Sequence, residues 1–376
     1  MTPPLHCRET IASVRQIRVP LVVWGCAAAA ILIAAAVFGY DPFDSSTWSR
    51  WDSGLYEDIA RNGYEVFPCD DPGTWCGDAA WLPAYPWIFG GLHQLGLPFR
   101  GTAVVVSWLF AAGTVVLLWR TFLGRGTSRA ALAGLFYAAF APGIIYHYAV
   151  FPLSMLAFFT VACLWLTYSE RHVYAGLAGA VAALTYPAGV LLAPITALWL
   201  LARRSVPLTE RLVQAATTSG LTLLGFWVLL LDQQLETGHW NAFFLVQEKY
   251  EVLHGSSIPF VTTWRIVRGL AHPDSGIGLV ISLQTALVTA VLAIVVVRAI
   301  QQRQRLESED SLVLIWALTS WVMIFQAFSI YRGQAVLLPV AILVARLPSK
   351  LAWTLAAAAV VIAVWLERYF LDNTLI

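Results

Sequence analysis

The chain has 376 residues, of which 59% are hydrophobic and 12% are charged, and its mean hydropathy is +0.70. A soluble domain carries about 25% charged residues, so half that share predicts an all-α polytopic membrane protein embedded in a lipid bilayer. The formal net charge of +1 argues against nucleic-acid binding, which requires a basic domain with Lys and Arg clustered on one face.

The first apolar segment, residues 20–39, contains no charged side chain. A helix of about 20 residues rises far enough to cross the hydrocarbon layer, so we expect a retained membrane anchor rather than a cleaved signal peptide. Arg8, Arg15 and Arg18 precede this segment. The positive-inside rule then predicts a cytoplasmic amino terminus.

The next segment, residues 41–80, is strongly acidic and is predicted to lie outside the membrane. It carries nine acidic residues and two basic ones, a net charge of −7. A connection between two spans needs only a few residues, so a loop of this length and charge indicates a functional segment. A solvated linker is the alternative.

Further apolar segments follow along the chain. They are residues 81–97, 101–119, 130–148, 152–168, 173–185, 187–202, 212–231, 276–298, 311–329, 333–346 and 351–370. Several are shorter than the roughly 17 residues that a span requires, so half-helices or interfacial pieces are expected among them, with ten to twelve crossings in total. Residues 1–376 are predicted to form a single integral membrane domain.

Basic clusters fix the expected orientation of these segments. Those at 203–211, 298–305 and 346–350 are predicted to be cytoplasmic, which makes residues 232–275 a second external segment. The basic residues at 120–129 break the alternation. Either residues 81–97 do not cross the membrane, or this loop departs from the rule.

Within the acidic loop, Trp51, Leu55 and Ile59 recur at intervals of four, which predicts a short helix lying in the membrane interface. Asp52 has two interpretations. It lies three residues after Ser49, as in a capping box at a helix start. Alternatively, it is a carboxylate just outside the bilayer that accepts a proton from an attacking hydroxyl.

Two stretches of this region resemble a known family. Arg-Trp-Asp-Ser-Gly-Leu-Tyr-Glu-Asp-Ile-Ala-Arg-Asn-Gly-Tyr-Glu at 50–65 resembles the Trp-Asp, Ile-Ala and Gly-Tyr signature of the PIG-V mannosyltransferases, and Ala-Trp-Leu-Pro-Ala-Tyr-Pro at 80–86 is similar to that family's Ala-Phe-Phe-Pro-Leu-Tyr-Pro. Their order and spacing agree with the family, and together they cover about a tenth of the chain.

The resemblance implies a membrane glycosyltransferase of the GT-C fold with about 10–12 transmembrane helices and a large first external loop bearing short interfacial helices. Such an enzyme moves mannose from a polyprenyl-phosphate-mannose donor to an acceptor hydroxyl with inversion at the sugar. Asp52 matches the family's acidic residue that is taken to be catalytic. Matching positions implied to form the site are Trp51, Tyr56, Gly63, Tyr64, Pro83, Tyr85 and Pro86.

Two family positions differ here. Met155 stands where an acid is usual, and Tyr186, in Leu-Thr-Tyr-Pro-Ala-Gly, stands where an arginine is typical. A phosphate still needs a cation or N–H donors. Arg332 is the preferred candidate and resembles an arginine near the family's last spans, with a snorkelling interfacial arginine as the alternative. Arg265 and Arg268 are weaker candidates.

Other candidates come from single residues. Cys69 and Cys76 predict a disulfide in the acidic loop, while Cys7, Cys26 and Cys163 are isolated. Asp58 and His147 are included as substrate-binding candidates, although an interfacial role is favoured for His147. Aromatic residues of the second external segment suit either sugar stacking or an interfacial helix. They are Trp240, Phe243, Phe244, Tyr250, Phe260 and Trp264.

The sequence shows no zinc, P-loop or dinucleotide motif, and the only expected cofactor is an optional divalent cation in the acidic loop. Alternatives to a transferase are a transporter or flippase of a lipid-linked sugar and a non-catalytic subunit of a glycosylation complex. A transporter is disfavoured because the spans are nearly free of charge. Expected partners are a polyprenyl-phosphate sugar donor and a glycolipid, glycan or glycoprotein acceptor. The expected location is a bacterial plasma membrane with an external active site.

Overall fold

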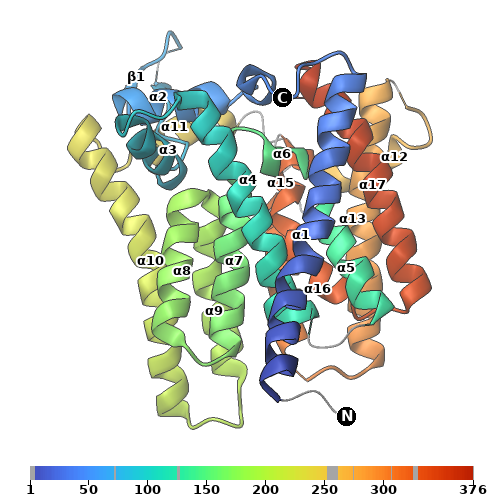
Figure 1. The fold of residues 1–376 in the computed structure, drawn as a ribbon. Coiled ribbons are helices and arrows are strands. Elements are labelled where there is room, and N and C mark those ends of the chain that lie inside the picture. The colour runs from blue at the N-terminus through green and yellow to red at the C-terminus, as the bar shows by residue number, and fades with distance from the viewer. Residues whose placement is uncertain are drawn as a thin grey trace.

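A computed structural model describes residues 5–71, 73–124, 128–251, 261–273, 275–305, 307–324 and 329–375. The chain is mainly helical (Figure 1). The helices of the first half are α1 (Leu5–Val37), η1 (Ser45–Trp48), α2 (Ser53–Asn62), α3 (Ala84–Gln94), α4 (Phe99–Leu118), the π-helical turn η2 (Trp119–Leu123), α5 (Arg129–Ala139), α6 (Ile145–Tyr148), α7 (Leu153–Tyr168) and α8 (His172–Thr185).

The helices of the second half are η3 (Pro187–Leu191), α9 (Leu192–Ala202), α10 (Leu208–Thr237), α11 (Ala242–Glu251), α12 (Val261–Arg268), α13 (Gly276–Gln301), α14 (Glu309–Ile324), α15 (Ile330–Gly333), η4 (Gln334–Val340), α16 (Ala341–Val344) and α17 (Ser349–Leu371). The strands β1 (Val66–Pro68) and β2 (Trp75–Gly77) form an antiparallel hairpin in which Phe67 pairs with Cys76.

Five helices in the described residues are long and apolar enough to cross a membrane: 16–37 within α1, 99–123 across α4 and η2, α10, α13 and α17. Shorter apolar helical segments of 10–17 residues accompany them. The predicted all-α polytopic architecture is therefore confirmed, and the chain is an integral membrane protein. The expected ten to twelve crossings stay a prediction, because the shorter segments do not meet the length of a full span.

Of the two alternatives for residues 81–97, the structure supports the one in which they do not cross the membrane. The helix of this segment, α3, has only 11 residues, which corresponds to a rise of about 16 Å. Gly96, with φ +93°, follows the end of α3, and Pro98 directly precedes α4. α3 packs against α2 and α4 at the end of the molecule that carries the hairpin and α11 (Figure 1). Without this crossing, the basic residues at 120–129 no longer conflict with the predicted orientation.

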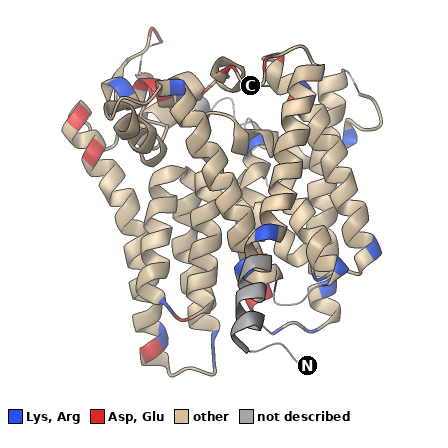
Figure 2. Cartoon of the chain, viewed as in Figure 1, with Lys and Arg blue, Asp and Glu red and all other residues tan. Residues whose placement is uncertain are grey.

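Charged side chains are gathered at the two ends of the helical body (Figure 2). Acidic residues are concentrated at the end that holds α2 and the upper end of α10, whereas basic residues gather toward the end that holds the amino terminus. This is the asymmetry that positive-inside orientation produces.

Small residues allow close helix contacts in the body. α8 packs along α10, and a Cβ added to Gly225 of α10 would lie 2.2 Å from the Ala180 carbonyl oxygen of α8. One turn along the same interface, a Cβ on Gly179 would lie 2.1 Å from Thr222 Oγ1. Membrane helices associate through such small-residue contacts because lipid provides little hydrophobic driving force between them. The resulting rigid body supports the acidic loop above it.

Candidate active site

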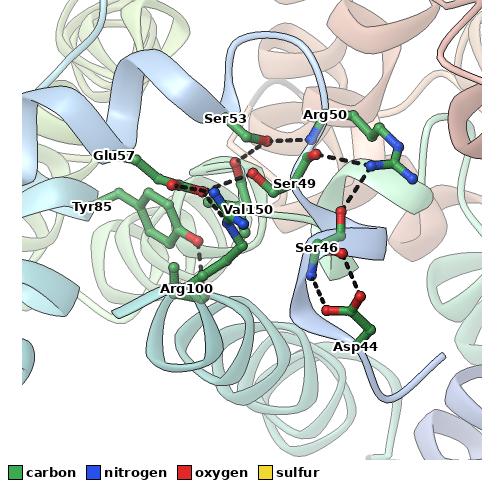
Figure 3. A network of polar contacts seen from close by, with 10 residues as sticks. Asp44, Ser46, Ser49, Arg50, Ser53, Glu57, Tyr85, Arg100 and Val150 are labelled. Carbon is green, nitrogen blue, oxygen red and sulfur yellow. Dashed lines mark hydrogen bonds and ion pairs between the residues drawn. The ribbon is translucent and has the colours of Figure 1, made fainter. Parts of the chain in front are cut away.

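The acidic loop is fastened to the turn between α6 and α7. The Val150 N–H donates to the Trp48 carbonyl oxygen at 3.0 Å, and Ser53 Oγ donates to the Val150 carbonyl oxygen at 3.1 Å. Trp48 is 1% exposed and closes η1 against the body. Figure 3 shows Ser53 and Val150 side by side at the start of α2. These contacts hold residues 49–53 at a defined position over the helices.

Two arginines also anchor the acidic loop to the helical body. Arg50 Nη1 donates to the Ser46 carbonyl oxygen at 2.8 Å, and Arg50 Nε donates to the Leu371 carbonyl oxygen at the end of α17 at 3.3 Å. Arg100 of α4 binds Glu57 through both of the carboxylate oxygens, at 2.8 and 3.0 Å (Figure 3). Burial raises the pKa of Glu57, but the hydrogen bonds from Arg100 and Ser49 outweigh it and hold this pKa below its usual range.

Asp52 lies between these fastened segments and follows a strained residue. Trp51 has φ +52°, a left-handed conformation that is uncommon for a bulky non-glycine residue. Arg332 Nη1 donates to Asp52 Oδ2, and Trp81 Nε1 donates to the same oxygen at 3.1 Å. Oδ1 accepts no hydrogen bond from the described residues. The Asp52 side chain is 23% exposed.

Arg332 is held in place by a buried amide network below α15. Gln284 Nε2 of α13 donates to the Tyr331 carbonyl oxygen and to Gln334 Oε1, both at 2.9 Å. Gln334 Nε2 in turn donates to Thr285 Oγ1 at 3.1 Å. Both glutamines are fully buried. A satisfied buried network of this kind fixes a backbone position, and here it fixes the residue that carries the guanidinium.

Three tyrosines surround the Asp52–Arg332 pair. Tyr56 of α2, Tyr146 of α6 and Tyr186 at the end of α8 interact electrostatically with the Arg332 guanidinium. The Tyr186 hydroxyl is within hydrogen-bonding reach of that guanidinium. The site therefore combines one carboxylate, one guanidinium and several neutral donors, drawn from the first loop, α6, α8 and α15.

The expected capping box at Ser49 and Asp52 is wrong. Ser49 Oγ donates to Glu57 Oε1 at 2.7 Å, and Asp52 occupies the N-cap position without a side-chain hydrogen bond to the helix. The reason is that Arg332 and Trp81 direct the Asp52 carboxylate away from the helix end. The expected apolar face also differs, because Trp51 precedes α2 and the buried face includes Tyr56 and Glu57, whose carboxylate is paired with Arg100.

Gly63 and Tyr64 position Trp81 instead of facing Asp52. Gly63 ends α2 with φ +76°, and a Cβ there would lie 2.7 Å from Glu236 Oε2 of α10. The same Oε2 accepts the Tyr64 N–H at 2.6 Å, and the Tyr64 hydroxyl donates to the Trp81 carbonyl oxygen at 2.8 Å. The Gly-Tyr pair thus ties α2 to α10 and secures the residue that binds Asp52.

Pro83, Tyr85 and Pro86 form the start of α3. Pro83 is its N-cap residue. The Tyr85 hydroxyl donates to the Ala103 carbonyl oxygen and lies 2.8 Å from Ser107 Oγ, and the side chain is fully buried between α3 and α4. In the described structure, Tyr85 therefore packs helices together, and its ring contacts Tyr56 at 6.0 Å between centroids.

The remaining candidate site residues have neighbours other than Asp52. Asp58 is exposed and acts electrostatically on Asp78 of the hairpin region. His147 is completely buried, with Nε2 3.3 Å from the Ala335 carbonyl oxygen, so the favoured interfacial role is wrong for it. It is buried because α6 is a short internal helix rather than the end of a span. Arg265 and Arg268 are exposed on α12.

The acidic loop and the second external segment meet at the hairpin. Cys69 and Cys76 form the expected disulfide. Trp75 packs edge-on to His239 with ring centroids 5.0 Å apart, and Lys249 Nζ of α11 lies 3.3 Å from Cys76 Sγ.

The aromatic residues of the second external segment differ in exposure. Trp240, Phe244 and Trp264 are exposed, while Phe243 packs against Phe226. The side chains of Tyr250 and Phe260 lie outside the described residues, as does that of Cys7.

Within the described ranges, no group of three or more His, Cys, Asp or Glu residues is arranged to hold a metal ion. The optional divalent cation stays a prediction.

Sequence reasoning missed Trp81 and Tyr146 as parts of the site. Trp81 was visible as an indole where the resembled family has phenylalanine, and that difference in donor capacity was the available signal. Tyr146 stands beside His147 and carries no comparable pattern.

Comparisons with known proteins identify the fold through solved structures and not through the sequence. No protein-family model and no curated protein matches the sequence. Solved structures do match. The Archaeoglobus fulgidus oligosaccharyltransferase AglB, in complex with an inhibitory peptide and a dolichol-phosphate, aligns with a TM-score of 0.53 and 13% identity. The alignment covers 94% of this chain and 56% of that one.

The apo form of the Archaeoglobus fulgidus oligosaccharyltransferase aligns with a TM-score of 0.53 at 15% identity, over 94% of this chain and 56% of that one. Its complex with Zn and sulfate gives a TM-score of 0.50 at 15% identity, over 93% and 52%. The chain therefore spans about half the length of these proteins. It has the GT-C fold of membrane glycosyltransferases, as the resemblance implied.

Proposed function

We propose that the protein is an inverting GT-C glycosyltransferase that moves mannose from a polyprenyl-phosphate-mannose donor to an acceptor hydroxyl, with Asp52 as the general base. The observation that carries this proposal is the asymmetric Asp52 carboxylate. Oδ2 is fixed by Arg332 and Trp81, and Oδ1 accepts nothing from the described residues. A base held in this way presents one oxygen in a defined direction.

In the proposed reaction the acceptor oxygen attacks C1 of the sugar from the face opposite the phosphate. The bond between C1 and the phosphate oxygen breaks, and its electron pair leaves with the polyprenyl phosphate. Asp52 Oδ1 takes the proton of the acceptor hydroxyl. Arg332 stabilises negative charge on the departing phosphate, because a guanidinium has five N–H donors and only Nη1 is committed to Asp52. A base of this kind contributes about 10²- to 10⁴-fold.

The same end of the molecule suits a lipid-borne donor. Asp52 lies on a loop placed directly above the helical body, where a lipid phosphate at the membrane surface reaches it. The basic residues gathered toward the opposite end support a cytoplasmic amino terminus and an external active site. A glycolipid, glycan or glycoprotein of the external face is the proposed acceptor, and a bacterial plasma membrane is the proposed location.

The donor is tested with purified protein in lipid nanodiscs and three radiolabelled donors: polyprenyl-phosphate-mannose, polyprenyl-phosphate-glucose and a nucleotide-linked mannose. Membrane extracts serve as acceptor. We expect label to be transferred from polyprenyl-phosphate-mannose with inverted anomeric configuration. Transfer from the glucose donor alone contradicts mannose but keeps the enzyme class. Transfer from none of the lipid donors contradicts the proposed activity.

One observation favours the transporter alternative. Glu367 of α17 is 1% exposed, and neither carboxylate oxygen has a hydrogen-bond partner among the described residues. Ionisable residues inside membrane spans often mark transport pathways. Glu367→Gln separates the two functions. Sugar transfer that is unchanged in this variant supports the transferase, whereas lipid-sugar flipping that is lost in it supports the transporter.

A further inference from the structure

One of the tyrosine hydroxyls beside Arg332 is buried without a hydrogen-bond partner among the described residues. Tyr146 is 1% exposed, and its hydroxyl is covered and has no hydrogen-bond partner in the described structure. Tyr56 is 3% exposed and lies beside the same guanidinium. An unsatisfied buried hydroxyl such as that of Tyr146 costs about 1–3 kcal/mol, so its place beside a guanidinium calls for a ligand.

The Phe151 ring is a common neighbour of Tyr146, Tyr56 and Arg332. Its ring lies 5.1 Å from the Tyr146 ring and 6.1 Å from the Tyr56 ring, centroid to centroid, and the Arg332 guanidinium carbon lies 5.9 Å from its centroid. Tyr186 reaches the same guanidinium from the end of α8. Four donor side chains from four separate elements therefore converge on one point next to Asp52.

The side chains around Arg332 supply more hydrogen-bond donors than charged acceptors. A guanidinium only donates, and each phenol offers one O–H, whereas Asp52 is the single charged acceptor among them and is already bound through Oδ2. A phosphate group has acceptor oxygens only, and charge-assisted hydrogen bonds to it are strong. Tyr186 supplies a neutral donor at the position where the resembled family has an arginine.

We propose that Tyr56, Tyr146 and Tyr186 form with Arg332 a phosphate cradle, in which neutral hydroxyls replace a second cation in holding the phosphate of the lipid-linked donor. This inference rests on the proposed function for the identity of the ligand. Because the Tyr146 hydroxyl is covered, its use requires the side chains around it to move as the donor enters.

The cradle is tested by direct binding of tritiated polyprenyl monophosphate, which carries no sugar, to protein in nanodiscs, with the uncharged polyprenol as reference. Tyr56→Phe, Tyr146→Phe and Tyr186→Phe are compared with the wild type. Each variant is expected to weaken phosphate binding by roughly 10-fold or more, the scale of one hydrogen bond to a charged group, and to leave polyprenol binding unchanged. Tyr137→Phe, at a buried tyrosine of α5, is the matched control and keeps full binding.

Thermal unfolding provides the second readout. Removing a hydroxyl that has no partner leaves stability unchanged or raises it, so Tyr146→Phe is expected to melt at or above the wild-type temperature while binding phosphate more weakly. Phosphate binding that is equal in all three variants and the wild type overturns the cradle, as does a lower melting temperature with unchanged binding. Sugar transfer by the wild type is measured separately, so either result leaves the proposed transferase standing if transfer is observed.

Discussion

Arg332 Nη1 donates a hydrogen bond to Asp52 Oδ2, although 280 residues separate the two in the chain. Asp52 is delivered by a loop tied to Val150, and Arg332 lies against the ring of the next residue, Phe151. The turn between α6 and α7 is therefore the common support of both charges. Their contact depends on the assembled helical body and not on either segment alone.

Trp81→Phe tests the orientation of Asp52. The variant keeps an aromatic ring but removes the N–H that binds Oδ2 at 3.1 Å. A hydrogen bond to a charged group contributes about 1.5–3 kcal/mol, so we expect kcat for sugar transfer to fall by roughly 10-fold or more, with the donor KM little changed. Steady-state kinetics with a fixed acceptor measures this split. A raised donor KM at unchanged kcat would assign Trp81 to donor binding instead.

Asp78 predicts a pH-dependent stability of the acidic loop. Its side chain is buried, and burial raises its pKa to about 6, with the nearby Glu65 and Asp58 charges adding to the shift. Its unfolded pKa is about 3.9. Protonation of Asp78 therefore favours the folded state. This contribution to the free energy of unfolding is lost as the pH rises through about 6.

Asp78→Asn removes the charge and keeps an oxygen that can accept the Glu65 N–H, now bound at 2.9 Å. We expect the variant to be more stable than the wild type by about 1–3 kcal/mol at pH 8, and the difference to vanish near pH 4. Thermal melts of both proteins between pH 4 and pH 8 measure this difference in stability. Parallel curves for the two proteins would contradict the assignment.

The Cys69–Cys76 disulfide predicts a local effect of reduction. The two cysteines are 7 residues apart, and closing so short a loop contributes about 2.5 kcal/mol in the chain-entropy model. A reducing agent is expected to lower the melting temperature of the wild type but not that of Cys69→Ser/Cys76→Ser. Cys26→Ser, at an exposed free cysteine, is the control and should respond to reduction as the wild type does.

Much of the architecture could be predicted from hydropathy, because a membrane span requires a long apolar helix whatever its neighbours are. The segments at 20–39, 212–231 and 351–370 lie within α1, α10 and α17, apart from two residues at the end of the first. The segment at 81–97 was placed correctly as separate from 101–119, but hydropathy did not decide whether it crosses. Its helix, α3, covers only Ala84–Gln94, and Gly96 follows its end.

The site could be predicted only where a residue's chemistry is local. Asp52 was identifiable from its motif and loop. Ser49 and Asp52 had capping spacing, but Ser49 binds Glu57 and Asp52 binds Arg332 and Trp81. Arg332 and the motif that contains Trp81 were both noted in the sequence, yet no local pattern shows that these two residues bind one carboxylate oxygen. The replacement at Tyr186 was visible in the sequence, yet its place beside Arg332 depends on how α8 and α15 are packed.

The most direct test of the account is sugar transfer from radiolabelled polyprenyl-phosphate-mannose by Asp52→Asn and the wild type, at matched amounts of folded protein. Asparagine retains the shape of the side chain and one oxygen for hydrogen bonding, but it cannot accept the acceptor's proton. We predict a loss of at least about 100-fold in kcat. Equal transfer by both proteins would contradict the role of Asp52 as the general base.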